Sequence, residues 1–166
     1  MDHLTELAER LGKVLLAQGE QVSCAESCTG GGIAEAITRV AGSSAWFEAG
    51  FVTYSNRQKT AQLGVPEALF AEHGAVSQAV VEAMARGAQR RSGARYAVAV
   101  SGIAGPGGGS AEKPVGTVWL AWADGARCEA RCYCFSGERQ AVRQQSVQQA
   151  LQGLLALLAG ENLPQG

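Results

Sequence analysis

The sequence predicts an α/β fold in which residues 1–166 form one domain, a mixed β-sheet with helices on both faces. Three observations support this prediction. Segments with helical spacing of apolar residues alternate with short apolar runs. The run Tyr96 to Val100 has the continuous apolar pattern of a buried strand. Asp124-Gly125 separates two apolar stretches and indicates an antiparallel hairpin, which makes the sheet mixed.

The helices are predicted from apolar periodicity and from their start and stop residues. Leu4, Leu7 and Leu11 follow helical spacing within residues 2–18, and Gly19 is suited to end that helix. The same reasoning predicts further helices over residues 32–40, 55–64, 66–74, 77–92 and 138–159.

Short apolar runs between these helices predict the strands, over residues 22–25, 49–54, 96–100, 115–123 and 126–135. Two of them, 22–25 and 96–100, lead directly into glycine-rich segments. In open α/β sheets, ligands bind beyond the carboxyl ends of the strands. The functional site is therefore expected where these two segments meet.

Charge and hydropathy exclude several classes of partner. The net charge is −1 and there is no basic run, which argues against nucleic acid because phosphate neutralisation needs clustered Lys and Arg. No apolar run approaches membrane length, so no membrane association is expected. Charged residues interrupt the N-terminal segment 1–19, which therefore lacks the pattern of a signal peptide. We expect a cytoplasmic protein.

The cysteines and histidines do not form an obvious site. The five cysteines include no CxxC pair, and a disulfide framework is not expected in a cytoplasmic chain of this size. Cys128, Cys132 and Cys134 would share one face of a strand and could bind zinc, but core packing is favoured because no further ligand lies nearby. His3 and His73 fall in predicted helices away from the glycine-rich segments, so a histidine-dependent triad is poorly supported.

The segment AESCTGGG, from Ala25 to Gly32, predicts a strand, a tight turn and a helix start. Such a turn exposes the hydroxyl of Ser27 beside free backbone N–H groups. This geometry suits a nucleophile near an oxyanion site or a cradle for phosphate, and a simple helix cap is the alternative. The neighbouring Cys28 is a rival nucleophile.

The second glycine-rich segment, SGIAGPGGGS over residues 101–110, lacks the Lys-Ser/Thr ending of a phosphate-binding P-loop. Its glycines still permit close backbone approach to an anion, although a connector into the hairpin is an equal alternative. Lys59 is by default an exposed helical lysine. If burial kept it neutral, it could act as a base for Ser27, with Tyr54 relaying a proton or holding the lysine.

Four segments in the same order carry a resemblance to a known family: AESCTGGG, GSSAWFEAGFVTYSNRQK, GAVS and VSGIAGPGGGSAEKPVGTVW. Together they resemble the CinA C-terminal domain family over roughly residues 5–158. The characterised members of this family include bacterial nicotinamide-nucleotide amidohydrolases. The family has a compact α/β fold and is commonly oligomeric, so the resemblance implies a homo-oligomer.

The resemblance implies that Ser27 is the nucleophile and that Tyr54 and Lys59 complete the catalytic group. The implied reaction is hydrolysis of nicotinamide mononucleotide to nicotinate mononucleotide and ammonia, with the nucleotide as small-molecule partner and with neither a metal nor an organic cofactor. The implied substrate-holding residues are Thr29, Gly30, Gly31, Ser101, Gly102, Gly105, Gly108 and, on a weaker local match, Arg139.

Two other functions remain open at this point. A non-catalytic pyridine-nucleotide-binding module would use the same two glycine-rich segments without turnover. A cysteine hydrolase would use Cys28 in place of Ser27, which the lack of a nearby histidine disfavours. Release of ammonia separates the binding module from an amidohydrolase.

Overall fold

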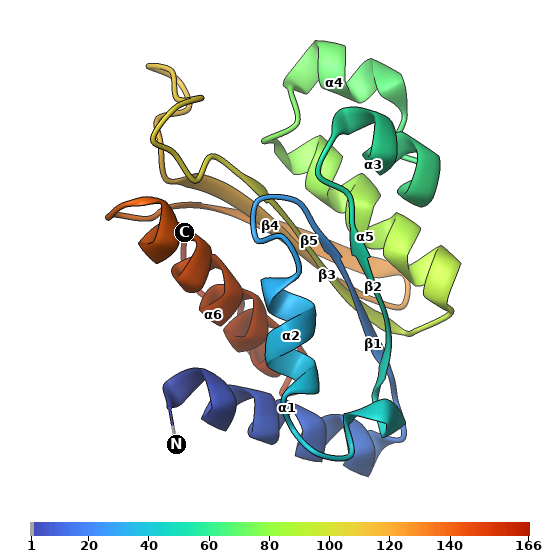
Figure 1. Ribbon diagram of the computed structural model, residues 1–166. Coiled ribbons are helices and arrows are strands. Elements are labelled where there is room, and N and C mark those ends of the chain that lie inside the picture. Colours follow the sequence, from blue (N-terminus) through green and yellow to red (C-terminus); the bar gives the residue numbers. More distant parts are fainter. Residues whose placement is uncertain (1) are drawn as a thin grey trace.

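The computed structural model describes residues 2–166 and contains a five-stranded sheet in the order β2-β1-β3-β4-β5 (Figure 1). Its strands are β1 (Val22–Glu26), β2 (Phe47–Val52), β3 (Tyr96–Gly102), β4 (Thr117–Asp124) and β5 (Arg127–Cys134). Strands β2, β1 and β3 are parallel, whereas β4 and β5 pair antiparallel. The predicted mixed sheet is confirmed.

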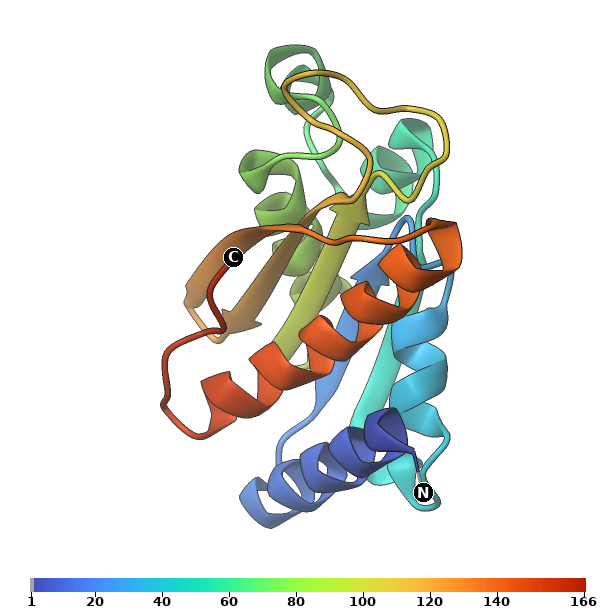
Figure 2. The ribbon, with the colours of Figure 1, turned by 90° about the vertical axis from the view of Figure 1, so that its left-hand side faces the viewer.

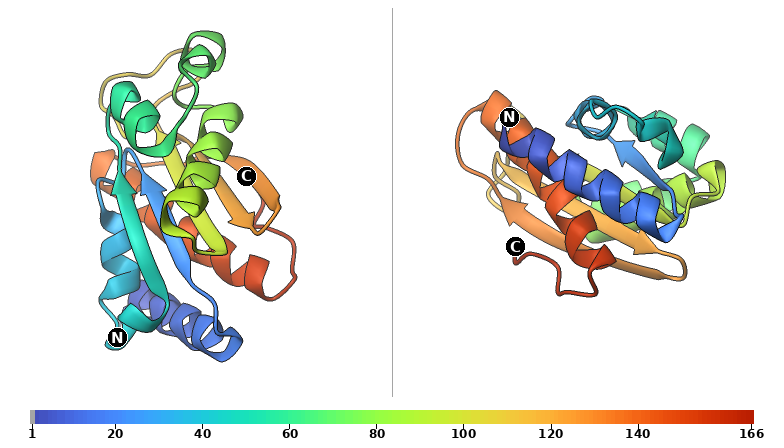
Figure 3. Two further views of the ribbon diagram at one scale, coloured as in Figure 1. Left: turned by 90° about the vertical axis from the view of Figure 1, so that its right-hand side faces the viewer. Right: turned by 90° about the horizontal axis from the view of Figure 1, so that it is seen from below.

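Helices cover both faces of this sheet, as predicted. They are α1 (His3–Gln18), α2 (Gly32–Thr38), α3 (Asn56–Leu63), α4 (Glu67–His73), α5 (Gln78–Ser92) and α6 (Arg139–Leu158). Helices α2 and α6 pack on one face, with α1 lying across them. Helix α5 packs on the other face, and α3 and α4 pack on α5 (Figures 1 and 3).

The two faces of the sheet bury different side chains. On the side toward α1, α2 and α6 the core holds large residues, among them Trp122 of β4 and Leu11 of α1, both fully buried. The face toward α5 presents small residues such as Ala97 and Ala121, which let this helix approach the sheet closely. Gly87 allows α3 to pack closely against α5, because a Cβ at this position would lie only 2.1 Å from the Leu63 carbonyl oxygen. Helix α3 is thereby held against the core.

Several element boundaries follow from capping residues that the sequence indicates. Asp2, Ser55 and Ser77 each accept a backbone N–H bond at the start of α1, α3 and α5. Gly19 ends α1 in the left-handed conformation, with φ of 66°. The predicted hairpin turn forms between β4 and β5, where Gly125 has φ of 55°.

The largest boundary difference is in β2, which spans Phe47–Val52 rather than residues 49–54. The cause is its neighbour β1, whose last residue, Glu26, pairs with Val52. One further hydrogen bond joins the two strands, from the Thr53 N–H to the Glu26 carbonyl. After it the chain has no partner strand, so Tyr54 lies outside the sheet. A short 3-10 helix, Ser43–Ala45, precedes β2 and carries no strong sequence signal.

The β5 cysteines lie on the sheet face that packs toward α5. Cys128 contacts the core beneath that helix, whereas Cys134 is exposed. Among residues 2–166, no group of three His, Cys, Asp or Glu side chains is placed to hold a metal ion. None of the helices described is long and apolar enough to cross a membrane.

Candidate active site

A pocket of about 290 Å³ lies at the edge of the sheet where the parallel strands β1, β2 and β3 end. This is the position expected for a ligand in an open α/β sheet. The pocket brings together most of the predicted site residues, namely Ser27, Tyr54, Lys59, Ser101, Gly102, Gly105, Gly108 and Arg139.

Ser27 and Lys59 form the chemical centre of this pocket. The Lys59 Nζ lies 3.0 Å from the Ser27 Oγ and 3.1 Å from the Tyr54 carbonyl oxygen. Lys59 is only 1% exposed, and this burial lowers the pKa of its amine. A neutral amine can donate to the Tyr54 carbonyl and still offer its lone pair to the Ser27 hydroxyl. When the amine is neutral, this contact is of the kind through which a serine can pass its proton to a lysine.

Lys59 is buried because it lies on the inward-facing side of helix α3. Lys59 and Leu63 are four residues apart and share one face, and both are buried. That face is turned toward α5 and the core. The default interpretation of an exposed helical lysine is therefore wrong.

Tyr54 contributes to this centre through its backbone. Its carbonyl oxygen accepts from Lys59 Nζ and lies 3.5 Å from Ser27 Oγ. Tyr54 is 59% exposed, and its hydroxyl accepts a hydrogen bond of 3.0 Å from Arg139. The backbone thus holds the lysine in place, whereas a proton relay through the phenol has no supporting contact in this structure.

Arg139 connects the second glycine-rich loop to Tyr54 at the pocket. Its guanidinium donates to the Gly105 carbonyl at 2.9 Å as well as to the Tyr54 hydroxyl. The loop, drawn in yellow, extends toward α4, where Lys113 Nζ donates to the His73 carbonyl at 2.8 Å (Figure 2). The loop is therefore attached at its base and near its far end by long cationic side chains.

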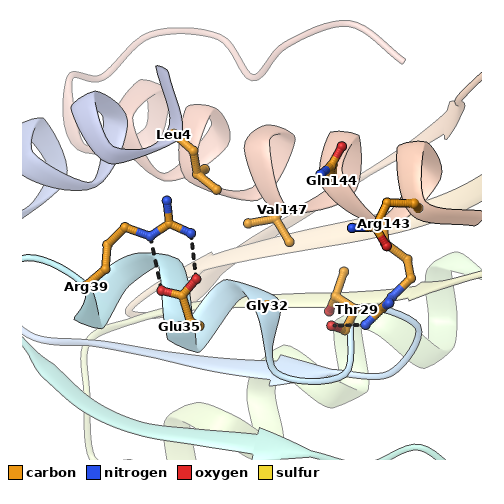
Figure 4. Close-up of a pocket in the computed structure, with 9 residues that line it drawn as sticks. Leu4, Thr29, Gly32, Glu35, Arg39, Arg143, Gln144 and Val147 are labelled. Atoms are coloured by element: carbon orange, nitrogen blue, oxygen red, sulfur yellow. Dashed lines mark hydrogen bonds and ion pairs between the residues drawn. The ribbon is translucent and has the colours of Figure 1, made fainter. Parts of the chain in front are cut away.

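The first glycine-rich turn lies differently from the expectation. Thr29, Gly30 and Gly31 do not line the pocket that holds Ser27. Thr29 is almost fully buried, and it borders a second pocket of about 250 Å³ that is also lined by residues of α2 and α6 (Figure 4). The contribution of these three residues to substrate binding remains a prediction, without support from the shape of the pocket.

Sequence reasoning missed Glu26, which anchors this turn. Its carboxylate is fully buried and accepts the Thr29 hydroxyl at 2.5 Å. It also accepts the backbone N–H groups of Ile33 at 2.9 Å and Ala34 at 3.0 Å. These bonds satisfy donors at the start of α2 and suit a negative charge there. An acidic residue at a strand end, just before a helix, was the available signal.

Sequence reasoning also missed Arg143 of α6. Its Nε donates to the Cys28 carbonyl at 3.1 Å, and its Nη2 donates to the Thr29 carbonyl at 3.3 Å. Arg143 follows Arg139 by four residues, which places both guanidinium groups on one face of α6. That spacing was the signal that could have identified it.

The rival nucleophile Cys28 has an unsuitable environment. Burial raises the pKa of its thiol to about 11. The thiolate is the reactive form of cysteine, and it is scarce near neutral pH in such a site. Neither His3 nor His73 lines the pocket to act as its base. The geometry therefore favours Ser27.

Comparisons with known proteins agree with this fold and show the family. The family model described as CinA C-terminal domain matches residues 4–158. Nicotinamide-nucleotide amidohydrolase PncC of Pseudomonas putida is 69% identical over 157 residues, covering 95% of this chain and 98% of that protein. Nicotinamide-nucleotide amidohydrolase PncC of Escherichia coli K12 is 58% identical over 153 residues, covering 91% and 92%.

Solved structures are similar over nearly the whole chain. A CinA superfamily protein from Klebsiella pneumoniae superposes with a TM-score of 0.92 at 39% identity, covering 96% of this chain and 99% of that one. The competence/damage inducible protein CihA from Agrobacterium tumefaciens also gives a TM-score of 0.92, at 47% identity, covering 95% and 96%. The chain belongs to the CinA C-terminal domain family.

Proposed function

We propose that this protein is an amidohydrolase that converts nicotinamide mononucleotide to nicotinate mononucleotide and ammonia. The observation that carries the proposal is the 3.0 Å contact between Ser27 Oγ and the buried Lys59 Nζ, inside a pocket lined by the second glycine-rich loop. The names of the relatives with 58% and 69% identity point to the same activity.

In the proposed mechanism, neutral Lys59 takes the proton from Ser27 as the serine oxygen attacks the carboxamide carbon. The tetrahedral intermediate collapses when Lys59 returns that proton to the leaving nitrogen, and ammonia departs. A water molecule that Lys59 deprotonates then attacks the Ser27 ester. The carbon–oxygen bond to Ser27 breaks, Lys59 returns the proton to the serine oxygen, and the product leaves as the carboxylate after losing its acid proton to solvent. General base catalysis by a positioned side chain contributes typically about 10²- to 10⁴-fold.

The nucleotide part of the substrate would bind along the second glycine-rich loop. Gly105 and Gly108 line the pocket, so a phosphate bound there would lie against the backbone of this loop. The guanidinium of Arg139 lies beside Gly105 and supplies positive charge for charge-assisted hydrogen bonds. Binding of the remote phosphate would position the carboxamide against Ser27.

The test is ammonia release from a panel of carboxamide nucleotides, with the product identified by mass spectrometry. The proposal expects ammonia and nicotinate mononucleotide in equal amounts from nicotinamide mononucleotide. Ser27→Ala serves as the control that removes the nucleophile. Tight nucleotide binding without ammonia release would instead support a non-catalytic binding module.

A further inference from the structure

Arg143 borders the second pocket, where Figure 4 shows it beside Thr29, two residues after Ser27 in the chain. Thr29 and Arg143 border the second pocket, whereas Ser27 and Cys28 border the catalytic pocket. The guanidinium reaches from α6 to the carbonyl oxygens of Cys28 and Thr29. These two carbonyls are therefore held toward Arg143, on the side of the turn that borders the second pocket.

The orientation of a carbonyl determines that of the N–H in the same peptide unit. In a planar trans peptide, the Cys28 carbonyl and the Thr29 N–H point in opposite directions. With the carbonyl held by Arg143, the Thr29 N–H points away from it. The N–H groups of Ser27 and Gly30 are bonded to the Val100 and Ser27 carbonyls, whereas those of Cys28 and Thr29 have no backbone acceptor among residues 2–166.

We infer that Arg143 is a positioning residue, which orients the Cys28–Thr29 peptide, next to Cys28 in the wall of the catalytic pocket, so that the Thr29 N–H stabilises the oxyanion formed when Ser27 attacks. This inference rests on the proposed function, because it assigns the oxyanion donor of that reaction. A donor aimed in advance at the developing charge acts mainly on the transition state. Arg143 touches neither the substrate nor the reacting atoms and acts through the backbone.

Glu26 holds the same turn by accepting hydrogen bonds from its donor groups. The carboxylate accepts the Thr29 hydroxyl and the N–H groups of Ile33 and Ala34, while Arg143 donates to the carbonyls. One side chain thus satisfies donors and the other satisfies acceptors. Removing the guanidinium leaves the Cys28 carbonyl without its partner and frees the Cys28–Thr29 peptide on that side, whereas the Thr29 carbonyl still accepts from the Gly32 N–H at 3.0 Å and the start of α2 stays attached to Glu26.

The test compares Arg143→Ala with a matched control, Arg39→Ala. Arg39 borders the same second pocket, but it pairs with Glu35 and does not contact the turn (Figure 4). For Arg143→Ala we expect the kcat of ammonia release to fall about 10²- to 10³-fold, as for loss of one oxyanion donor, with little change in KM. Arg39→Ala should keep the kcat of the unaltered protein. Added methylguanidine should partly restore Arg143→Ala.

A second readout does not depend on the nucleotide. A fluorophosphonate reacts with an activated serine: the Ser27 oxygen bonds to phosphorus, fluoride leaves, and Lys59 takes the proton. The phosphoryl oxygen then occupies the oxyanion position. Labelling of Arg143→Ala at Ser27 should be slower by at least about tenfold if one donor is lost, and Arg39→Ala should label at the normal rate.

The outcomes separate the inference from the proposed function. Unchanged kcat and labelling in Arg143→Ala, or a raised KM with normal kcat, would overturn the inference while the proposed function stands. If the unaltered protein labels at Ser27 but releases no ammonia, the proposed function fails and the labelling rates alone decide the inference. If it does neither, both are overturned. Should Arg143→Ala fail to fold by circular dichroism, Arg143→Lys decides by the same measurements.

Discussion

The two glycine-rich segments follow neighbouring strands, β1 and β3, but they are held in place in different ways. The turn after β1 is anchored by the fully buried carboxylate of Glu26 and by Arg143. The loop after β3 depends on Arg139 at Gly105 and on the half-buried Lys113, which makes a solvent-exposed bond to the His73 carbonyl. One segment is built into the core, and the other is attached at the surface.

This difference matches the two tasks of the proposed reaction. Attack by a nucleophile requires its oxygen to be held within a fraction of an ångström, which buried charged hydrogen bonds provide. Substrate binding tolerates a loop that adjusts to its ligand. We therefore expect changes in the first turn to act on kcat and changes in the second loop to act on KM or on substrate preference.

The largest effect is expected for Ser27→Ala. Loss of the nucleophile should lower ammonia release by at least about 10⁴-fold, while nucleotide binding measured by calorimetry stays within a few-fold. Cys28→Ala is the matched control and should keep most of the activity, because burial raises the pKa of this thiol to about 11. Activity that survives in Ser27→Ala but is lost in Cys28→Ala would contradict the serine mechanism.

Lys59→Arg should come next, with a loss of about 10²- to 10⁴-fold in kcat, because arginine stays protonated and cannot act as the base. Substrate KM should change little. Steady-state kinetics on this variant, beside the folded control Arg57→Lys on the exposed side of α3, would measure the effect. Near-normal turnover of Lys59→Arg would reduce Lys59 to an electrostatic role.

The pH dependence of the unaltered enzyme follows from the same residue. Burial lowers the pKa of Lys59, and only the neutral amine accepts the Ser27 proton. Activity should therefore be low below that pKa, rise as the pH increases through it, and level off above it. A kcat profile that is flat across the acidic range would contradict a lysine base.

The second loop is tested by removing the phosphate from the substrate. A charge-assisted phosphate contact is worth about 1.5–3 kcal/mol, so losing two should lower kcat/KM by at least about a hundredfold. Nicotinamide riboside should accordingly be a much poorer substrate than the mononucleotide, and free nicotinamide poorer still. Equal kcat/KM values for the riboside and the mononucleotide would mean that this loop does not hold a phosphate.

The smallest effect is expected for Lys113→Ala, which detaches the far end of the loop from α4. A surface hydrogen bond of this kind contributes about 0.5–1.5 kcal/mol, which corresponds to a two- to tenfold rise in KM if the attached loop is the binding form. The kcat should not change, because Lys113 does not line the pocket that holds Ser27. A large fall in kcat would show that the loop also takes part in the chemistry.

Much of the architecture could be predicted from local sequence patterns. The helices from α1 to α6, the buried strand β3 and the turn at Gly125 follow from apolar periodicity, capping residues and glycine. The end of β2 could not be predicted from local patterns, because the length of its partner strand β1 decides where pairing stops. The resemblance to the CinA family added the site residues, and the structure brings Ser27, Lys59 and Arg139 to one pocket.

The sequence by itself determined the order of the elements, the position of both glycine-rich segments at strand ends, and the family. Only the tertiary structure decided that Lys59 is buried beside Ser27, that Tyr54 contacts it through a carbonyl, and that Arg143 reaches a turn 115 residues away along the chain. The physical reason is that periodicity and capping act over a few residues. Burial, and with it the pKa of a lysine, depends on neighbours that are distant in sequence and adjacent only after folding.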